Sequence, residues 1–332
     1  MRLAIVSDAW SPQVNGVVRT LSTVRRELER RGHVVDVIAP HQFRTVPCPT
    51  YPEIRLAVLP GRAMGRRLDA LAPDAIHVAT EGPLGIAARA HCRRRGLAFT
   101  TSFHTRFPDY VAARIGIPRG WLYAWLRRFH GASAGVMVAT DSLMRELADR
   151  GFGNLRRWSR GVDTTLFRPG PKALYAAPRP IFLNVGRIAV EKNIEAFLAL
   201  DLPGTKVVVG DGPQRALLQR RRPDAIFLGT KEGDDLARHF AAADVFVFPS
   251  RTDTFGLVML EALAAGVPVA AFPVPGPLDV VDGHPVGVLD ADLGKAARAA
   301  LAIPGERCRA YAEGFSWERC TDQFLVNLVP VR

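Results

Sequence analysis

Two series of alternating strands and helices, separated by one proline-rich stretch, constrain the fold of this chain most strongly. Short β-branched runs alternate with longer segments of helical periodicity, first in residues 2–140 and again after residue 180. Such alternation predicts βαβ units. Runs such as LAIV and VMVAT are apolar at successive positions, which is typical of parallel strands covered by helices on both faces. We therefore expect an α/β chain with two Rossmann-like domains facing a central cleft.

The length of the chain and the break in its periodicity predict where the domains divide. A chain of 332 residues is long for a single hydrophobic core, which favours two domains. Residues 159–180 are rich in proline and interrupt the alternation, so we expect the interdomain link there. The prediction is an amino-terminal domain over residues 1–165, a carboxy-terminal domain over residues 172–312, and a final helix within residues 313–332 that packs back across the junction.

Positive charge is concentrated in the first half of the chain. Residues 1–171 contain 26 arginines, no lysine and 13 acidic residues, whereas residues 172–332 contain 18 basic and 19 acidic residues. A cationic half beside a nearly neutral one suggests an anionic partner, which is a membrane surface, a nucleic acid or an acidic substrate. A solvated arginine-rich surface without such a partner is the alternative.

The cysteines and the lengths of the apolar runs bear on the compartment. Cys48, Cys92, Cys308 and Cys320 are scattered without a Cys-x-x-Cys pair, which argues against zinc and against a disulfide framework and favours a reducing cytosol. The first residues enter a strand at once, and no run approaches the length of a membrane span. We expect a cytoplasmic protein that is peripheral on the cytosolic face of the inner membrane.

Two loops of the first domain lie where ligands bind in open α/β sheets, beyond the carboxyl ends of strands. Asn15 and Gly16 lie between the first strand and its helix, and His104 follows a later strand. Glycine lets the backbone approach a ligand closely, and a histidine near the cleft suits a polar contact with a substrate. A plain turn and a structural histidine are the alternatives.

Cations and glycines follow the first two strands of the second domain. Arg187 and Lys192 lie five residues apart in one loop and suit a diphosphate, since arginine offers a planar fork and lysine a point charge. Gly210 opens a Gly-Asp-Gly turn that lacks the spacing of a dinucleotide fingerprint or a P-loop. NAD and ATP binding therefore gain no specific support.

A pair of acids marks a further loop of the second domain. Asp253 and Glu261 stand eight residues apart, and Thr254, Phe255 and Gly256 open the helix that carries Glu261. Amides at a helix start can bind a phosphate, and a carboxylate two turns along can accept two ribose hydroxyls.

Together these loops resemble the retaining glycosyltransferases of family four, which have the GT-B fold. The resemblance covers almost the whole chain and is carried by PSRTDTFGLVMLEALAAGVPV, GRIAVEKN, GDGP and the early Asn-Gly loop. Lipid and mannosyl transferases look most similar, on the strength of SDAWSPQVNGVVRT, ATEGPLG, TSFHTRFPDYV and SRGVDTTLFRP. The resemblance implies transfer of a sugar from a nucleotide diphosphate donor with retention of the anomeric configuration.

The resemblance also implies roles for the matched residues of the second domain. Arg187 and Lys192 would hold the diphosphate and stabilise the leaving group, so that neither a metal nor another cofactor is required. Glu261 would bind the ribose and Asp253 the donor sugar, with Gly210 in the same donor site. The first acid of the family is usually Glu, and here it is Asp253, one methylene shorter.

In the first domain, the resemblance places Asn15 and Gly16 against the phosphate and sugar, and His104 against the sugar near the reacting centre. No residue stands out as a nucleophile beneath the sugar, so the two-carboxylate scheme of glycosidases is not expected. The family expectation is attack on the same face as the leaving group, with the departing diphosphate taking the acceptor proton.

Two segments of the cationic domain, which receives the acceptor in the GT-B arrangement, predict a membrane surface. Residues 60–71 combine arginines with apolar residues, and residues 118–130 place two tryptophans one helical turn apart beside further arginines. Arginine meets lipid phosphates and tryptophan enters the headgroup layer. The alternative is ordinary packing, with the tryptophans in the core. The candidate membrane residues are Arg62, Arg66, Arg67, Trp121, Trp125, Arg127 and Arg128.

The expected reaction is transfer of a hexosyl or hexuronosyl group from a UDP-sugar or GDP-mannose to a membrane lipid such as diacylglycerol. The main alternative is a GDP-mannose-dependent mannosyltransferase acting on a soluble or polyprenyl-linked glycan, and a GT-B sugar-nucleotide epimerase is a weaker one. An inactive GT-B binding scaffold is disfavoured because Arg187, Lys192 and Glu261 are present. No nucleic-acid partner is expected, because the basic residues show no groove-reading motif or aromatic RNA platform.

Overall fold

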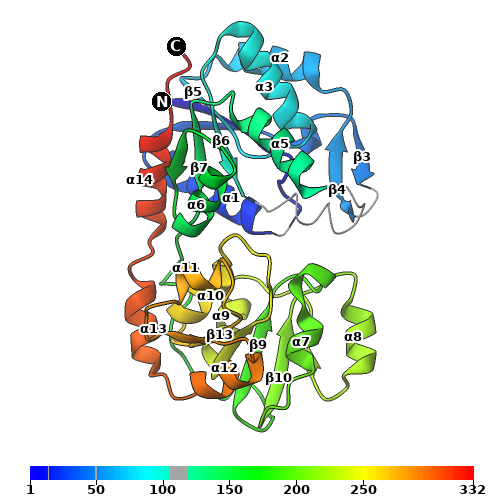
Figure 1. Ribbon diagram of the computed structural model, residues 1–332, viewed down its shortest axis with the longest axis vertical. Coiled ribbons are helices and arrows are strands. Elements are labelled where there is room, and N and C mark those ends of the chain that lie inside the picture. The colour runs from blue at the N-terminus through cyan, green and yellow to red at the C-terminus, as the bar shows by residue number, and fades with distance from the viewer. Residues whose placement is uncertain (14, 49–50, 105–117) are drawn as a thin grey trace. The chain divides into compact units, whose positions relative to one another are not determined.

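The chain forms two compact units, drawn in Figure 1. This computed structural model describes residues 1–332 except 14, 49–50 and 105–117, and for residues 51–53 it describes the backbone alone. Unit 1 comprises Met1–Ser159 and Trp317–Arg332, and unit 2 comprises Arg160–Ser316. Each unit is built on a six-stranded parallel sheet with helices. The prediction of an α/β chain with two Rossmann-like domains is confirmed.

The sheet of unit 1 has the strand order β2-β1-β5-β6-β7-β8. Its strand β1 is buried on both faces, because Leu3 and Ile5 belong to one hydrophobic cluster and Ala4 and Val6 belong to the other. Strands β3 and β4 form a separate antiparallel hairpin. The strands of unit 1 are β1 (Arg2–Val6), β2 (Val34–Ile38), β3 (Thr45–Cys48), β4 (Tyr51–Ala57), β5 (Ala75–Val78), β6 (Thr100–Phe103), β7 (Gly135–Val138) and β8 (Leu155–Arg157).

Helices cover both faces of this sheet. Helices α1 and α14 bury Leu21 and Phe324 in the cluster of Leu3, whereas α2 and α3 bury Met64 and Leu84 in the cluster of Ala4. The helices of unit 1 are α1 (Gly16–Arg30), η1 (Pro40–Gln42), α2 (Gly61–Leu71), α3 (Pro83–Arg95), α5 (Arg119–His130), α6 (Asp141–Asp149) and α14 (Trp317–Asn327).

The last residues of the chain complete the core of unit 1. Helix α14, drawn in red in Figure 1, packs against α1. The indole N–H of Trp158 donates to the carbonyl oxygen of Cys320 at 3.1 Å, and the Trp158 and Phe324 ring centroids are 5.0 Å apart. The amide of Val331 donates to the carbonyl of Asp74 at 2.9 Å. Unit 1 is thus assembled from both ends of the sequence.

The sheet of unit 2 has the order β11-β10-β9-β12-β13-β14, so the strand sequence reverses between β9 and β12. Phe182, Val208, Val247 and Ala270 bury one face of the sheet in a common cluster with Ala297 of α12. The strands are β9 (Ile181–Val185), β10 (Thr205–Val209), β11 (Ile226–Phe227), β12 (Val245–Phe248), β13 (Val269–Ala271) and β14 (Gly287–Leu289). The helices are η2 (Val190–Lys192), α7 (Ile194–Leu198), α8 (Arg215–Arg221), α9 (Gly233–Ala242), α10 (Leu257–Ala264), α11 (Pro277–Val280), α12 (Leu293–Ala300) and α13 (Gly305–Ala312).

Candidate active site

The loops that follow β9 and β12 meet at the reversal point of the unit 2 sheet, where doubly wound folds bind their ligands. The side-chain amide of Asn193, in the loop after β9, donates to the carbonyl oxygen of Pro249 after β12 at 3.1 Å. Asn193 adopts a left-handed backbone conformation with φ 54°, which asparagine tolerates better than most residues. The two loops are therefore fastened to each other beside the predicted donor residues.

Lys192 and Asp253 form an ion pair across these two loops. The ammonium Nζ lies 2.5 Å from Oδ1 of Asp253, and the two side chains are 28% and 17% exposed. The second carboxylate oxygen, Oδ2, is buried and has no hydrogen-bond partner among the described residues. The structure thus brings together a predicted phosphate-binding cation and a predicted sugar-binding acid.

The loop after β10 packs directly against the loop that carries Arg187. Gly210 has φ 140°, and a Cβ there would lie 1.9 Å from the carbonyl oxygen of Gly186, so only glycine fits. The amide of Ile188 donates to the carbonyl of Asp211 at 2.8 Å. Arg187 is therefore held between two residues whose backbone is fixed by the neighbouring loop.

Helix α10 carries the second acid of the predicted pair. Its N-cap is Gly256, with φ 82° and no side chain to bond the first amides, and a helix start of this kind suits a phosphate. Phe255 is buried just before it, and Thr254 is partly exposed. Glu261 lies inside the helix with only 3% of its surface exposed. A ribose contact with Glu261 therefore requires the donor to reach a nearly buried carboxylate.

The predicted residues of unit 1 lie at the carboxyl edge of its sheet. Asn15 caps α1, since its Oδ1 accepts hydrogen bonds from the amides of Val17 and Val18 at 3.0 Å each. Gly16 is the first residue of that helix. His104 directly follows β6 and is buried, with its ring centroid 5.6 Å from that of Trp158. The rest of the TSFHTRFPDYV motif, from residue 105 on, lies outside the described residues.

Asp8 is a buried residue at the same edge that the sequence analysis did not identify. Its Oδ1 accepts a hydrogen bond from the amide of Leu84 at 2.9 Å, and its Oδ2 accepts from the Thr80 hydroxyl at 2.9 Å and the Gly85 amide at 3.3 Å. Burial raises the pKa of Asp8, while these bonds act in the opposite direction. The sequence held one indication of this contact. Gly82, at the start of α3, has no side chain to cap the helix, so the first amides of α3 need an acceptor from elsewhere in the chain.

Glu81 and His130 form a second group that spacing did not predict. Nε2 of His130 lies 3.1 Å from Oε1 of Glu81, and Nδ1 lies 2.9 Å from the Thr101 hydroxyl. These distances fit a tautomer in which Nε2–H donates to the carboxylate. His130 therefore orients Glu81 just after β5, near the edge where ligands bind.

The tryptophans of α5 are exposed to solvent. Trp121 is 77% exposed and Trp125 is 39% exposed, so the alternative that places them in the core is wrong. Arg128 is exposed on the same helix, and Arg127 donates to the carbonyl oxygen of Arg150 at 3.2 Å. Among the described residues, no helix is both long enough and apolar enough to cross a membrane.

The arginines of α2 differ in their contacts. Arg62 and Arg66 are exposed. Arg67 donates to the carbonyl oxygen of Gln42 at 3.2 Å, and its guanidinium lies 5.4 Å from the ring centroid of Phe43. Arg67 thus has a structural role on this helix, whereas Arg62 and Arg66 present their charge to solvent.

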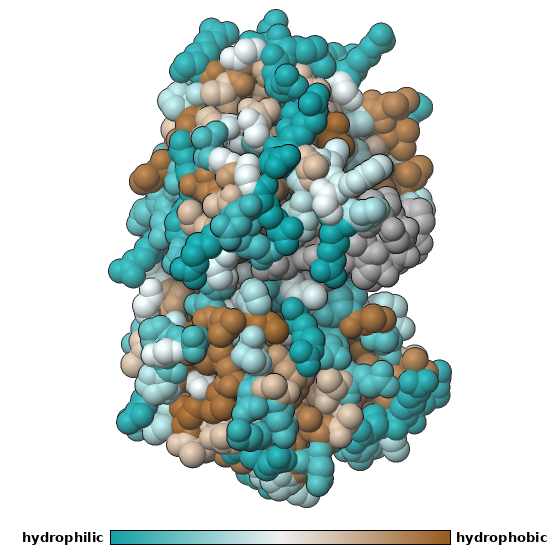
Figure 2. Space-filling view, viewed as in Figure 1, coloured by the Kyte–Doolittle hydropathy of each residue, from teal (hydrophilic) through white to brown (hydrophobic). Residues whose placement is uncertain are grey.

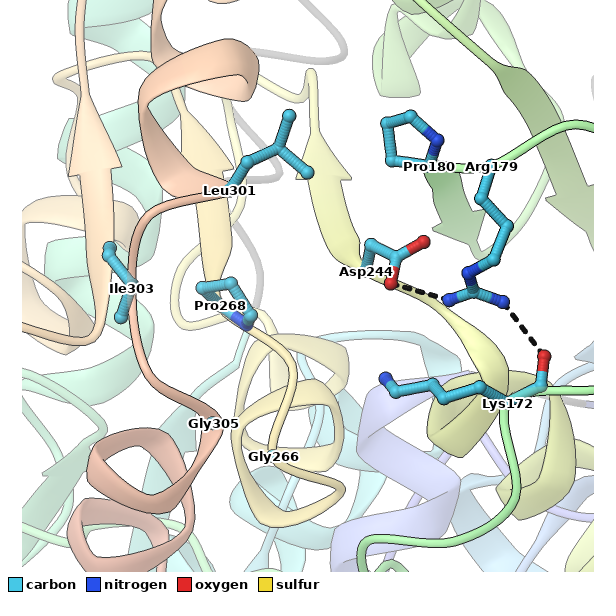
Figure 3. Close-up of a pocket in the computed structure, with 9 residues that line it drawn as sticks. All are labelled: Lys172, Arg179, Pro180, Asp244, Gly266, Pro268, Leu301, Ile303 and Gly305. Carbon is cyan, nitrogen blue, oxygen red and sulfur yellow. Dashed lines mark hydrogen bonds and ion pairs between the residues drawn. The ribbon is translucent and has the colours of Figure 1, made fainter.

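A cavity of about 510 Å³ lies in unit 2, at the end of the sheet where β9, β12 and β13 begin (Figure 3). Arg179 donates there to Asp244 at 2.5 Å and to the carbonyl oxygen of Lys172 at 2.8 Å, and the Lys172 ammonium donates to the carbonyl oxygen of Ala243. The cations that line this cavity are thus hydrogen-bonded within the protein. The cavity lies at the opposite end of the strands from Lys192. In the described part of the chain, no three His, Cys, Asp or Glu side chains are grouped to hold a metal ion.

Two family models match the chain, one in each half. The model described as Glycosyltransferase Family 4 matches residues 14–166, and the model described as Glycosyl transferases group 1 matches residues 179–303. A GDP-mannose-dependent alpha-mannosyltransferase of Mycobacterium tuberculosis is 34% identical over 318 residues, which cover 87% of this chain and 83% of that protein. The alpha-monoglucosyldiacylglycerol synthase of Streptococcus pneumoniae is 27% identical over 352 residues, covering 92% of this chain and 79% of the synthase.

A solved structure supports the fold independently. The sucrose-phosphate synthase of Thermosynechococcus elongatus superimposes with a TM-score of 0.77 at 21% identity, over 98% of this chain and 97% of that one. The architecture of two Rossmann-like domains therefore matches a known fold along almost the whole chain.

Proposed function

This chain belongs to glycosyltransferase family 4, and we propose that it transfers a hexosyl group from a nucleotide diphosphate sugar, with GDP-mannose as the first donor to test, to a membrane lipid such as diacylglycerol. That the chain is a glycosyltransferase of the GT-B fold, acting on a lipid or glycan acceptor, is the premise. The choice of GDP-mannose rests on the donor in the name of the mycobacterial relative, and the lipid acceptor on the name of the pneumococcal synthase.

The pairing of Lys192 with Asp253 carries the donor part of the proposal. On donor binding, the diphosphate takes the place of Asp253 as the partner of Lys192, and the freed carboxylate accepts hydrogen bonds from sugar hydroxyls. Arg187, fixed by its neighbouring loop, provides the second cation. Both cations then stabilise the charge that grows on the leaving diphosphate, in a geometry set before the reaction begins.

The start of α10, Glu261 and Gly210 provide the remaining contacts with the donor in this proposal. The start of α10 at Thr254, Phe255 and Gly256 receives a phosphate, and Glu261 holds the ribose hydroxyls. The bare backbone at Gly210 allows the nucleotide to approach closely.

Asn15, Gly16 and His104 of unit 1 contact the donor phosphate and sugar in this proposal. Because Arg187 and Lys192 supply the positive charge at the leaving group, the transfer requires no metal. Retention of the anomeric configuration is consistent with the family, and the departing diphosphate accepts the acceptor proton on the same face of the sugar.

The acceptor part of the proposal rests on the exposed residues of unit 1. Trp121 and Trp125 on α5, with Arg62 and Arg66 on α2, offer the aromatic and cationic groups that meet a lipid headgroup layer. The protein then works as a peripheral enzyme on the cytosolic face of the membrane.

The test incubates purified protein with GDP-mannose, UDP-glucose or UDP-glucuronic acid, with and without diacylglycerol in anionic vesicles. Nucleotide release and new glycolipids are followed by mass spectrometry, with EDTA added in parallel and the Lys192→Ala protein as the inactive control. We expect one donor to give an α-linked glycolipid that forms equally well in EDTA. A β-linked product, or a strict need for added metal, would overturn the corresponding part of the proposal.

A mannosyltransferase acting on a soluble or polyprenyl-linked glycan is the second candidate, because the name of the mycobacterial relative specifies a donor and no acceptor. Nucleotide release that increases with soluble mannosides or polyprenyl-linked sugars, and not with lipid vesicles, would favour this candidate. Conversion of the donor without any acceptor would instead indicate an epimerase.

A further inference from the structure

Helix α3 of unit 1 carries a groove lined by arginines. The groove has a volume of about 350 Å³ and is lined by Arg89, Ala90, Arg93 and Arg94. Ile86, one turn before Arg89 and Ala90, is 47% exposed. In Figure 2, hydrophilic residues in teal lie among hydrophobic ones in brown on the face of unit 1 turned toward the viewer. The outer side of α3 is therefore both cationic and partly apolar.

Arg89 joins this groove to α5. Its guanidinium donates to the carbonyl oxygens of Phe129 at 2.9 Å and Arg128 at 2.8 Å, at the carboxyl end of α5. It also lies 5.8 Å from the Phe129 ring centroid. Burial lowers the pKa of Arg89, and the nearby charges of Arg93 and Arg128 lower it further. The guanidinium of Arg89 is thus close enough to those of Arg93 and Arg128 for their like charges to repel it.

Within the described ranges, carboxylates do not compensate this charge. Asp69 pairs with His91 and Arg95, on a neighbouring part of α3. Of the carboxylates in the described ranges, none lies within ion-pair distance of Arg93, Arg94 or Arg128. Uncompensated like charges in one place favour binding of an anion, since the anion relieves their repulsion.

The exposed tryptophans continue the same surface. Trp121, Trp125 and Arg128 are spaced at four and three residues, so they share one face of α5. The Trp125 ring centroid is 6.0 Å from that of Phe129, the ring that Arg89 covers. Indole rings exposed to water do not gain the favourable free energy of burial. In membrane proteins, tryptophan is enriched at the headgroup region of the bilayer.

We propose that the arginine groove of α3 and the tryptophan face of α5 form one surface that lies on an anionic bilayer, with lipid phosphates in the groove and Trp121 and Trp125 at headgroup level. This inference rests on the proposed lipid acceptor and deepens it by identifying the membrane-contacting surface. It adds Arg93 and Arg94 of α3, which the sequence patterns did not identify. Charge complementarity selects an anionic bilayer over a neutral one.

The test measures co-sedimentation with phosphatidylcholine vesicles that contain either no phosphatidylglycerol or 30 mol % of it. We expect the wild-type protein to bind only the anionic vesicles and to be released by salt. The groove variant Arg93→Gln/Arg94→Gln should bind them about twentyfold more weakly, from the loss of two surface cations. The control variant Arg26→Gln/Arg145→Gln, with the same loss of charge on exposed residues of α1 and α6, should bind within about threefold of wild type.

A second measurement uses vesicles with dibrominated acyl chains, which quench tryptophan fluorescence on contact. Quenching should be strong in the wild-type protein and should disappear in Trp121→Phe/Trp125→Phe, which retains Trp10, Trp158 and Trp317. Equal binding of the groove and control variants, or quenching that persists without the two tryptophans, would overturn the proposal. So would a groove variant that loses affinity for nucleic acid while keeping its affinity for vesicles.

The experiments distinguish an error in the proposed membrane-contacting surface from an error in the proposed reaction. Nucleotide release from the donor in the absence of vesicles should be the same in wild type and in Arg93→Gln/Arg94→Gln, because neither residue belongs to the donor site. If nucleotide release is normal but vesicle binding fails, only the proposed membrane-contacting surface is overturned. Vesicle binding without any release or transfer overturns the proposed function instead.

Discussion

The ammonium of Lys192 lies 2.5 Å from Oδ1 of Asp253, although 61 residues separate them in the chain. Each group neutralises the other in the absence of donor, and Asp253 Oδ2 is buried with no hydrogen-bond partner in the described parts of the protein. In the proposed donor complex, this ion pair is exchanged for two sets of contacts, one of Lys192 with the phosphate and one of Asp253 with the sugar. The ion pair orients both side chains before a donor arrives.

Replacing Lys192 by alanine should lower kcat by about 10²- to 10³-fold, because a preorganised cation at the leaving group is lost. The change should also lower the thermal midpoint, since Asp253 is left half-buried with no ionic partner. Steady-state kinetics and a thermal scan measure the two effects. In the Lys192→Ala/Asp253→Asn protein we expect the midpoint to recover and kcat to stay low, and a recovered kcat would contradict the role of Lys192.

Replacing Glu261 by glutamine should weaken donor binding about 10- to 100-fold with a smaller effect on kcat, because the side chain loses its negative charge and one acceptor oxygen, which weakens its hydrogen bonds in the ground state and the transition state alike. Isothermal titration with the donor nucleotide and a comparison of KM with kcat measure this. The exposed Glu306 on α13 provides a matched control in Glu306→Gln. A large fall in kcat with unchanged affinity would argue against a ribose contact.

Replacing Gly210 by alanine should lower the thermal midpoint and reduce kcat at least tenfold, because the new Cβ would lie 1.9 Å from the Gly186 carbonyl oxygen and would shift the loop that holds Arg187. The destabilisation should be about 2 kcal/mol or more in denaturant unfolding. Gly186→Ala is the control for backbone strain, since Gly186 has φ 152° and open space around its Cβ position. Equal losses in the two variants would show that the close approach of the loops is unimportant.

The strands of both sheets could be predicted because their residues are apolar on both faces, as the split of Leu3 from Ala4 into opposite clusters shows. The loops that carry Arg187 and Asp253 could be predicted because they follow such strands. The ion pair of Lys192 with Asp253 could not, since it depends on the side-by-side placement of β9 and β12. Contacts between residues so far apart in the chain cannot be predicted from the spacing of residues along the sequence.

Helix α5 shows a different limit of prediction. Trp121 and Trp125 share one face, but Tyr123, Leu126 and Phe129 make another face apolar too, so periodicity alone did not decide which face is buried. The structure buries the second face and exposes the tryptophans. The groove on α3 was unpredictable for a related reason, because it depends on Arg89 reaching a carbonyl 40 residues away.

The four cysteines, all free thiols, should differ in their reactivity toward alkylating reagents. Burial raises the pKa of Cys92 to about 11 and that of Cys308 to about 12. Burial favours the protonated thiol over the thiolate, which is why the pKa is raised. These thiols therefore remain unreactive at pH 8 and form thiolates only as the pH approaches those values. Cys320 is also buried, whereas Cys48 is partly exposed.

We therefore expect iodoacetamide at pH 8 to modify Cys48 alone in the native protein and all four cysteines after unfolding in urea. Intact-mass measurement counts the adducts, and peptide mapping locates them. Rapid native labelling of Cys92 or Cys308 would contradict the burial of these side chains.

The placement of α14 has a consequence for the order in which the protein folds during synthesis. Unit 2 has all of its residues, 160–316, outside the ribosome before Cys320 and Phe324 emerge to close the core around Trp158. The half of the chain that is made first is therefore the half whose core is finished last. Until then the apolar side chains that α14 covers, Trp158 among them, stay without that cover, so unit 1 is open to aggregation for as long as unit 2 is being synthesised.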